Sequence, residues 1–184
     1  MRVISGKYKG KYIEGFDIDG TRPTKDRVKE SIFGSIQNKV KNSIFLDLFA
    51  GSGSIGIEAL SNGASKCYFV ENGESIYKIL SHNTAEIDNV YLIKNDYLDA
   101  LKQFNKDSIK FDIIYIDPPY HLKLMNKSIK YIEDNNLLSI NGIIICEYEE
   151  EEPICSYNLI RNKKFGKTNI AIYKNNQYVG SVYE

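Results

Sequence analysis

Short apolar runs alternate with longer amphipathic segments along most of the chain. Apolar runs are typical of strands buried in a sheet, and apolar residues that recur every three or four positions are typical of covering helices. From residue 43 onward this pattern predicts strands at Ile44–Leu48, Lys66–Glu71, Val90–Asn95, Phe111–Ile116 and Gly142–Glu147. It predicts helices between them at Ser54–Asn62, Glu74–Ile87, Tyr97–Phe104 and Leu122–Asn135. Such alternation indicates an α/β protein with a mostly parallel sheet.

The two ends of the chain depart from this alternation. Two β-like pieces, Arg2–Ser5 and Lys11–Ile13, predict a hairpin, so we expect residues 1–20 to extend a domain of residues 21–184. A helix is predicted after Pro23, where apolar residues recur at Val28, Ile32, Phe33 and Ile36. Near the other end, two β-like segments flank a Lys-Lys-Phe-Gly-Lys turn and predict an antiparallel hairpin at the sheet edge, namely Tyr157–Arg161 and Asn169–Lys174. Ligands of such sheets bind beyond the carboxyl ends of the parallel strands.

Composition narrows the class of protein. A hydrophobic content of 42% over 184 residues fits one globular domain. Because no segment approaches the roughly 18 apolar residues of a membrane span and the start lacks the apolar run of a signal peptide, we expect a cytoplasmic protein without a membrane partner. Cys67, Cys146 and Cys155 are far apart and form no CxxC pair. We therefore expect neither a disulfide framework nor a bound metal.

The net charge of zero conceals an uneven distribution. Residues 1–41 contain ten Lys and Arg against five Asp and Glu. A positive segment beside an acidic remainder could direct a polyanion to one end of the molecule. Lysine-rich surfaces are also common on proteins that bind no nucleic acid. The charge distribution alone therefore favours the interpretation that these basic residues are simply exposed to solvent.

A glycine-rich loop follows the first strand of the alternating region. Asp47-Leu-Phe-Ala-Gly-Ser-Gly-Ser-Ile-Gly56 places GxGxxG between a strand and a helix, and Glu71 ends the next strand. Glycines let the backbone approach a nucleotide closely, and the carboxylate can accept hydrogen bonds from ribose hydroxyls. This pattern fits any adenosine-type cofactor, NAD included.

Two further carboxylates favour a methionyl cofactor over a pyrophosphate. Asp47 would repel a diphosphate but attract an ammonium group, and Asp96, which ends the third strand, could accept from an adenine amino group. No Lys or Arg lies within the loop. These features predict S-adenosylmethionine, held by Asp47, Phe49, Ala50, Gly51, Gly53, Glu71, Asn72, Asp96, Tyr97 and Asp117.

The most specific motif is Asp117-Pro118-Pro119-Tyr120, directly after the fourth predicted strand. Two prolines remove two N–H donors, so the turn presents acceptors only. Asp117 and the Pro118 carbonyl could each accept one N–H of an exocyclic amino group and aim its nitrogen lone pair at the methyl donor, while Tyr120 stacks on the base. We expect these four residues to be the catalytic ones. Carbon-5 methylation is disfavoured because it needs a thiolate nucleophile in a suitable setting.

With these segments in view, the chain resembles the RsmD family of bacterial 16S rRNA guanine-N2 methyltransferases. The resemblance covers nearly the whole chain and includes the glycine loop and the Asp-Pro-Pro-Tyr turn. Its most diagnostic segments are Arg2-Val-Ile-Ser-Gly-Lys-Tyr-Lys-Gly-Lys-Tyr12 and Arg22-Pro-Thr-Lys-Asp-Arg-Val-Lys-Glu-Ser-Ile-Phe33, with Phe165-Gly-Lys-Thr-Asn-Ile-Ala-Ile-Tyr173 near the end.

The resemblance implies a seven-stranded, Rossmann-like class I methyltransferase fold and methylation of one guanine of 16S rRNA in the small ribosomal subunit. It implies that the helix after Pro23 closes over the methionyl end of the cofactor, with Thr24 and Arg27 at the matching positions. We expect a monomer that contacts RNA through Lys7, Lys9, Lys11 and Arg22.

One segment departs from the family pattern. After the fifth predicted strand the chain has an acidic run, Glu147–Glu152, which we interpret as a solvated charged loop. Successive carboxylates repel phosphates, so this run leaves RNA contacts near that edge in doubt.

Three alternative functions stay open from the residues alone. Adenine-N6 methylation of DNA or RNA would use the same turn, and an NAD-dependent dehydrogenase would explain the glycines and Glu71. A dehydrogenase would leave the Asp-Pro-Pro-Tyr turn unused, and the two histidines, His82 and His121, suggest no clear acid–base group. A non-catalytic RNA-binding module would not need both the cofactor loop and the turn.

Overall fold

The computed structural model describes residues 1–15 and 22–176, without the side chains of residues 22–24. Its helices are α1 (Arg22–Val40), α2 (Ser54–Ser61), α3 (Glu74–Thr84), α4 (Tyr97–Lys106) and α5 (Leu124–Asp134). Its strands are β1 (Ile44–Asp47), β2 (Lys66–Glu71), β3 (Val90–Lys94), β4 (Phe111–Ile116), β5 (Leu138–Tyr148), β6 (Asn158–Phe165) and β7 (Thr168–Lys174). Within these described ranges, no helix is both long and apolar enough to cross a membrane.

All seven strands form one sheet in the order β3-β2-β1-β4-β5-β7-β6. The first five strands in this order run parallel to one another, whereas β7 runs antiparallel to both β5 and β6. The predicted α/β class, with a seven-stranded, mostly parallel sheet and an antiparallel C-terminal hairpin, is therefore confirmed. The strand order reverses between β1 and β4, and this switch point is where open α/β sheets bind ligands.

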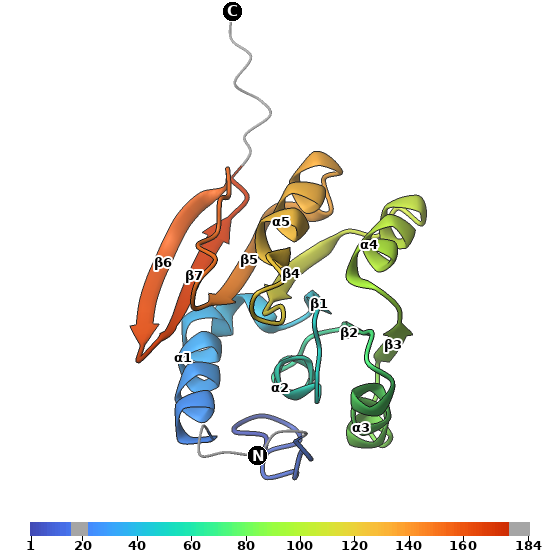
Figure 1. Ribbon diagram of the computed structural model, residues 1–184. Coiled ribbons are helices and arrows are strands. Elements are labelled where there is room, and N and C mark those ends of the chain that lie inside the picture. The colour runs from blue at the N-terminus through green and yellow to red at the C-terminus, as the bar shows by residue number, and fades with distance from the viewer. Residues whose placement is uncertain (16–21, 177–184) are drawn as a thin grey trace, which may run out of the picture.

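Helices cover both faces of the sheet, with α1, α2 and α3 on one face and α4 and α5 on the other (Figure 1). Alternate residues of each strand point into the two cores, because successive side chains of a strand project to opposite faces. Ile143 and Ile145 pack with α1 and α2, whereas Ile144 and Cys146 pack with α4 and α5. Burial on both faces explains why the central strands consist of continuous apolar runs.

The hairpin at the sheet edge is longer than predicted. Lys163, Lys164 and Phe165, expected in the turn, continue β6, and only Gly166 and Lys167 join it to β7. Gly166 has φ of 60°, a left-handed conformation that glycine adopts without a Cβ penalty, so two residues suffice to reverse the chain. The longer strand carries its basic residues along the edge of the sheet.

The N-terminal segment pairs its two arms at a single antiparallel bridge, Arg2 with Tyr12, and docks on α2. Its turn lies so close to α2 that a Cβ on Gly6 would stand 2.0 Å from the Ser61 carbonyl oxygen. The Ser61 oxygens accept from the Lys7 amide at 2.8 Å and from the Tyr8 amide at 2.9 Å. Only glycine fits at position 6, where φ is also 85°.

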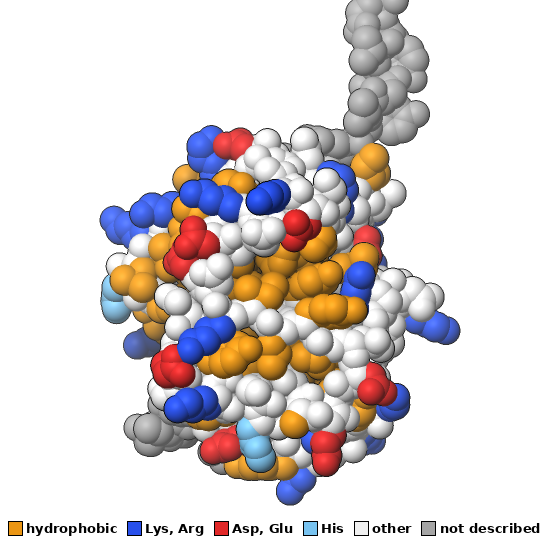
Figure 2. Space-filling model, turned by 90° about the vertical axis from the view of Figure 1, so that its right-hand side faces the viewer, with side chains coloured by type: hydrophobic (Ala, Val, Ile, Leu, Met, Phe, Trp, Pro, Cys, Tyr) orange, Lys and Arg blue, Asp and Glu red, His pale blue; other side chains and the backbone are white. Residues whose placement is uncertain are grey.

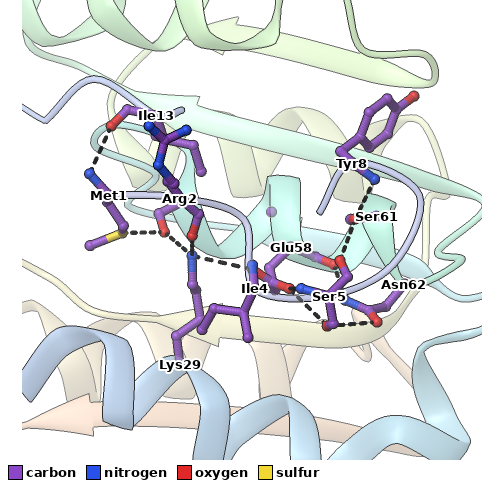
Figure 3. Close-up of polar contacts among 12 residues, drawn as sticks. Met1, Arg2, Ile4, Ser5, Tyr8, Ile13, Lys29, Glu58, Ser61 and Asn62 are labelled. Carbon is purple, nitrogen blue, oxygen red and sulfur yellow. Dashed lines mark hydrogen bonds and ion pairs between the residues drawn. The ribbon is translucent and has the colours of Figure 1, made fainter. Parts of the chain in front are cut away.

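A buried ion pair fastens this segment to two helices (Figure 3). Lys29 of α1 and Glu58 of α2 are 2% and 1% exposed, and their charged atoms are 3.2 Å apart. Lys29 also donates to the Arg2 carbonyl and to Ser54, both at 3.1 Å. The remaining carboxylate contacts come from the start of the chain and from α2, namely the Ile4 amide, the Ser5 amide and hydroxyl, and the Asn62 amide group. We call these residues the Lys29–Glu58 cluster.

The free edge of the sheet at β3 exposes aromatic surface. Figure 2 faces this side and shows hydrophobic side chains gathered across its middle, between charged ones. Tyr68 and Tyr91 stack at 4.9 Å, and the ammonium group of Lys66 lies 5.8 Å from the Tyr91 ring centre. Lysines beside an edge strand discourage pairing with a second sheet.

Candidate active site

Carboxylates stand at the carboxyl ends of three neighbouring strands. Asp47 ends β1, Asp117 follows β4, and Glu147 lies near the end of β5. Asp47 pairs in register with Tyr115, and Ile116 pairs with Cys146, so Asp117 and Glu147 are the next positions of adjacent strands. The switch point of the sheet therefore concentrates negative charge, which we call the Asp47–Asp117–Glu147 cluster.

Asp47 is buried and hydrogen-bonded to the glycine loop. Its Oδ2 accepts from the Gly56 amide at 3.1 Å, and the side chain is 1% exposed. Burial, together with the charges of Glu71 and Glu147, raises the pKa of Asp47 to about 7 against the lowering effect of the Gly56 N–H. A carboxyl group in this state would ionise readily if a cation entered beside it.

Asp117 and Glu147 form a hydrogen-bonded carboxyl pair. Burial and then the adjacent Glu147 raise the pKa of Asp117 well above its usual range. Burial also raises the pKa of Glu147, although hydrogen bonds from Tyr115 and Asp117 oppose this effect. Lys25, on the first turns of α1, lowers the pKa of both carboxyl groups through its charge. Two carboxylates this close favour holding one proton between them.

The glycine loop takes the shape that its residues predict. Gly51 and Gly53 have φ of 56° and 89°, and both therefore occupy the left-handed region. Gly56 serves packing instead, because a Cβ there would lie 2.2 Å from the Phe69 ring and 2.7 Å from the Cys67 sulfur. α2 can therefore begin directly against the sheet, with its first amides at the switch point.

Glu71 holds two loops together. One oxygen accepts from the Gly51 amide at 2.9 Å and the other from the Gly73 amide at 2.8 Å. Asn72, between these contacts, is exposed, and Ala50 is buried with its amide bonded to the Val70 carbonyl. The carboxylate at the end of β2 is thus fixed beside the glycine loop.

Asp96 caps α4, the ordinary role for an acidic residue before a helix. Its Oδ2 accepts from the Leu98 amide at 3.0 Å and from the Asp99 amide at 3.4 Å. The next residue, Tyr97, packs its ring 5.4 Å from that of Phe49. The two half-buried rings bring the loops after β1 and β3 together.

The Asp-Pro-Pro-Tyr turn borders a pocket of about 260 Å³. Tyr120 is 51% exposed, and its hydroxyl donates to Glu149 at 3.1 Å. Beyond it, His121 and Lys123 both have positive φ, at 69° and 53°, so the loop turns sharply before α5. The pocket combines an exposed aromatic ring with acceptor atoms, which suits a flat group that carries N–H donors.

The acidic run is only in part the solvated loop that we expected. Glu147 contacts Tyr115 and Asp117, and Glu149 contacts Tyr120. Glu151 accepts from the amides of Met125 and Asn126 at 3.0 and 3.2 Å, at the N-terminus of α5. These contacts form because β5 ends beside the Asp-Pro-Pro-Tyr turn, so consecutive carboxylates find partners along it. Glu149, Glu150 and Glu152 nevertheless remain exposed, and Glu150 pairs with the exposed His121 at 3.3 Å.

Several predicted site residues lie apart from the switch point. Arg27 lines a groove between α1 and β6. Lys7 lies 3.8 Å from Asp88, and its amide bonds to Ser61 at the far end of α2, near the amino edge of the sheet. Lys9 is exposed and Lys11 half-buried on the same segment. The side chains of Arg22 and Thr24 are outside the described part of the chain.

Sequence reasoning missed two members of the site. Glu147 follows a buried apolar run, as Asp47 and Asp117 do, but it is also the first of six residues that include five glutamates. The same rule of a carboxylate at a strand end would have selected it. Lys25 had no such signal, because its approach to Asp117 depends on how α1 packs on the sheet.

Comparisons with known proteins agree with this geometry. A family model described as "Conserved hypothetical protein 95" matches residues 1–174. The chain is 34% identical over 182 residues to the ribosomal RNA small subunit methyltransferase D of Haemophilus influenzae, covering 95% of this chain and 94% of that protein.

Solved structures share the fold. A structure from Escherichia coli with the provisional name methyltransferase yhhF is 27% identical, covers 97% of this chain and 99% of its own, and gives a TM-score of 0.83. An RNA methyltransferase from Salinibacter ruber, solved with S-adenosyl-L-homocysteine, is 14% identical, covers 91% of this chain and 99% of its own, and gives a TM-score of 0.61.

Proposed function

The chain belongs to the RsmD family of ribosomal RNA small subunit methyltransferases, and from this membership we propose that it methylates the exocyclic N2 of a guanine in 16S rRNA. As a member of this family it is an RNA methyltransferase. One observation carries the finer assignment: Asp117-Pro118-Pro119-Tyr120 lies at the switch point, beside Glu147 and a pocket of suitable size. The proposed partner is the 16S rRNA of the small ribosomal subunit, met in the cytoplasm by a monomer of this chain.

The proposed methyl donor is S-adenosylmethionine, and the loops after β1 and β2 fit it. Gly51 has no Cβ and a left-handed backbone, so a nucleoside can approach the loop, and Glu71 presents its carboxylate beside it. Asp47 is a buried carboxyl group with no cation within 4.0 Å among the described residues, which the ammonium of a methionyl group would complement. Tyr97 and Phe49 would flank the adenosine, with Asp96 near its amino group. When bound, this cofactor supplies an electrophilic methyl group.

Asp117 and the Pro118 carbonyl would position the target amine. Each accepts one N–H, which turns the nitrogen lone pair toward the methyl donor. Asp117 and Glu147 repel each other when both are ionised, and a shared proton or a hydrogen-bond donor relieves this repulsion. The amino group of the target base would supply such donors between them. Glu147 is thus a candidate to take up the proton that the amine releases. Tyr120 would stack on the base, which must be unpaired or flipped out of its helix.

The acidic lining of the pocket favours guanine over adenine. The Watson–Crick edge of guanine has N–H donors at both N1 and N2, whereas adenine has an acceptor at N1. Glu147 and Glu149 border the pocket with acceptor oxygens. A carboxylate facing N1 would bind guanine and repel the adenine lone pair, which supports the guanine assignment.

Contacts to the rest of the RNA come from basic residues away from the pocket. We propose that RNA is also contacted by the N-terminal segment, residues 1–20, and by the start of the domain. The contacting residues would be Lys7, Lys9, Lys11 and Arg22. Since Lys7 is near the amino edge of the sheet, such contacts would reach RNA remote from the target base.

A methyl-transfer assay tests the proposal. Labelled S-adenosylmethionine would be supplied with small ribosomal subunits, protein-free 16S rRNA or duplex DNA, and the products digested for nucleoside mass analysis. We expect N2-methylguanosine from the ribosomal substrates. N6-methyladenosine would instead support the adenine alternative, and thermal stabilisation by NAD but not by S-adenosyl-L-homocysteine would contradict the cofactor assignment.

A further inference from the structure

A second hollow of the molecule lies between α1 and β6, away from the cofactor loops. It measures about 440 Å³ and is open to solvent. Ser31 and Gly34 form its floor on α1, and β6 forms its other wall. Apart from the backbone of α1 itself, no atom of the described residues lies within 4 Å of where a Cβ on Gly34 would stand, so this part of the groove is unfilled.

The walls of this groove are basic. Arg27 of α1 faces Arg161 and Lys163 of β6 across it, against one acidic residue, Glu30. Arg161 and Lys163 alternate along the strand and therefore share one face of β6. Over the described part of the chain, none of the three cations forms an ion pair. Lys7 of the predicted basic arm, by contrast, already has Asp88 as a partner.

An aromatic ring lies at one end of the groove. Phe165 is half-buried, and the ammonium group of Lys163 is 5.0 Å from its ring centre. Phe165 follows Arg161 and Lys163 at the same alternation, so ring and cations line the same wall. Cationic grooves with an aromatic platform are the usual means of holding single-stranded nucleic acid.

The aromatic end of the groove is at the catalytic edge. β6 runs antiparallel to β7, and β7 antiparallel to β5, so β6 ends at the same edge of the sheet as β5. Phe165 pairs with Thr168, and Glu147 pairs with Ile170 only two residues further along β7. The groove therefore leads toward the carboxyl pair at the switch point.

We infer that this groove binds the RNA strand next to the target nucleotide, with Arg27, Arg161 and Lys163 on phosphates and Phe165 under a neighbouring base. The inference rests on the proposed function, and it names the surface through which the RNA is held. It also accounts for how RNA approaches a site that carries the acidic run. Phosphates on the α1–β6 side meet cations, whereas the pocket itself needs carboxylates for the base.

A competing explanation is that the lysines of β6 only protect an edge strand. Residues 158–164 are exposed, and charged side chains on a free edge prevent association of sheets. Protection of an edge strand does not require the aromatic ring of Phe165. It also predicts that RNA binding is unchanged when the charges of β6 are removed. The two explanations therefore differ in a measurable way.

The test compares two double variants that remove equal charge. Arg161→Ala/Lys163→Ala alters the groove, and Lys102→Ala/Lys106→Ala alters exposed residues of α4 on the opposite face. Binding of protein-free 16S rRNA would be measured between 50 and 200 mM KCl. Each lost phosphate contact should reduce the slope of log affinity against log salt concentration by roughly 0.7–0.9. The slope of the groove variant should therefore be smaller by about 1.4–1.8, and its affinity at 100 mM salt should be at least about tenfold weaker. The α4 variant should match the wild type.

A second pair of variants tests the aromatic platform. Phe165→Leu should weaken RNA binding about fivefold or more, while Phe165→Tyr retains it. An unchanged slope in the groove variant, or an equal loss in the α4 variant, would overturn the groove assignment. If the wild type neither binds nor methylates rRNA, the proposed function fails instead. Every variant should bind S-adenosyl-L-homocysteine with the affinity of the wild type. This control shows that a loss of RNA binding does not come from misfolding.

Discussion

Two clusters of charged residues in this molecule differ in how their charges are compensated. In the Lys29–Glu58 cluster, one cation meets one carboxylate, and backbone amides and hydroxyls satisfy the remaining oxygens. In the Asp47–Asp117–Glu147 cluster, three carboxyl groups gather with Lys25 as the nearby cation, and burial raises the pKa of each.

The difference distinguishes a structural polar cluster from a binding site. A buried ion pair with all its hydrogen bonds made holds segments in one arrangement. Carboxyl groups that repel one another cost stability, and they persist where a ligand supplies the missing donors and positive charge. Four predictions test this contrast, ordered from the largest expected effect to the smallest.

Asp117→Ala should reduce methyl transfer by about a thousandfold or more, because the alanine side chain has no acceptor that could orient the amine. Single-turnover assays on small ribosomal subunits measure the loss. Affinity for S-adenosyl-L-homocysteine, measured by calorimetry, should stay within a few-fold. Full activity in this variant would show that the carboxyl group of Asp117 is not needed for methyl transfer.

Lys29→Met should lower the free energy of unfolding by about 3–5 kcal/mol, because Glu58 would remain buried without its cation. Urea titration at pH 7.5 measures the change. Lys29→Met/Glu58→Gln should recover part of this loss, since a neutral glutamine leaves no unpaired buried charge and its one oxygen can still accept from the Ile4 or the Ser5 amide. If the single and double variants are equally unstable, the charge imbalance is not the cause.

Asp47→Asn should raise the free energy of unfolding at pH 8 by about 2–4 kcal/mol while abolishing cofactor binding. The folded pKa of about 7 exceeds the unfolded one, so ionisation of Asp47 costs stability as pH rises from about 4 to 7, at about 1.4 kcal/mol per pH unit. The asparagine oxygen can still accept from Gly56. The gain should shrink toward pH 4, and a gain that is independent of pH would contradict the assigned cause.

Glu147→Gln should move the acidic limb of the activity profile to lower pH. Asp117 must be ionised to accept from the amine, and Glu147 is the neighbouring group that most raises its pKa. Glu152→Gln, an exposed position of the same acidic run outside the pocket lining, serves as the control with an unchanged profile. If the acidic limb does not move in Glu147→Gln, ionisation of Asp117 is not what sets it.

The sequence predicted the sheet well because buried parallel strands are continuous apolar runs, and Phe111–Ile116 and Lys66–Glu71 were predicted with their observed bounds. It predicted the positions of Asp47 and Asp117 because strand ends meet at one edge. It did not predict the ion pair of Lys29 with Glu58, since charged residues on two helices give no sign of mutual burial. The placement of Arg27 beside Arg161 likewise depends on a crossing between α1 and β6 that no local pattern encodes.

The strand order also has a consequence for biosynthesis. β7 lies between β5 and β6, although it is made after both. Until residues 168–174 leave the ribosome, β5 has an open flank and β6 has no partner, because every hydrogen bond that holds β6 in the sheet comes from β7. Chains grow at about 5–20 residues per second, so the earlier strands can assemble during translation while the basic wall of the α1–β6 groove waits for the last strand. An incomplete chain would therefore contain the cofactor loops without this wall.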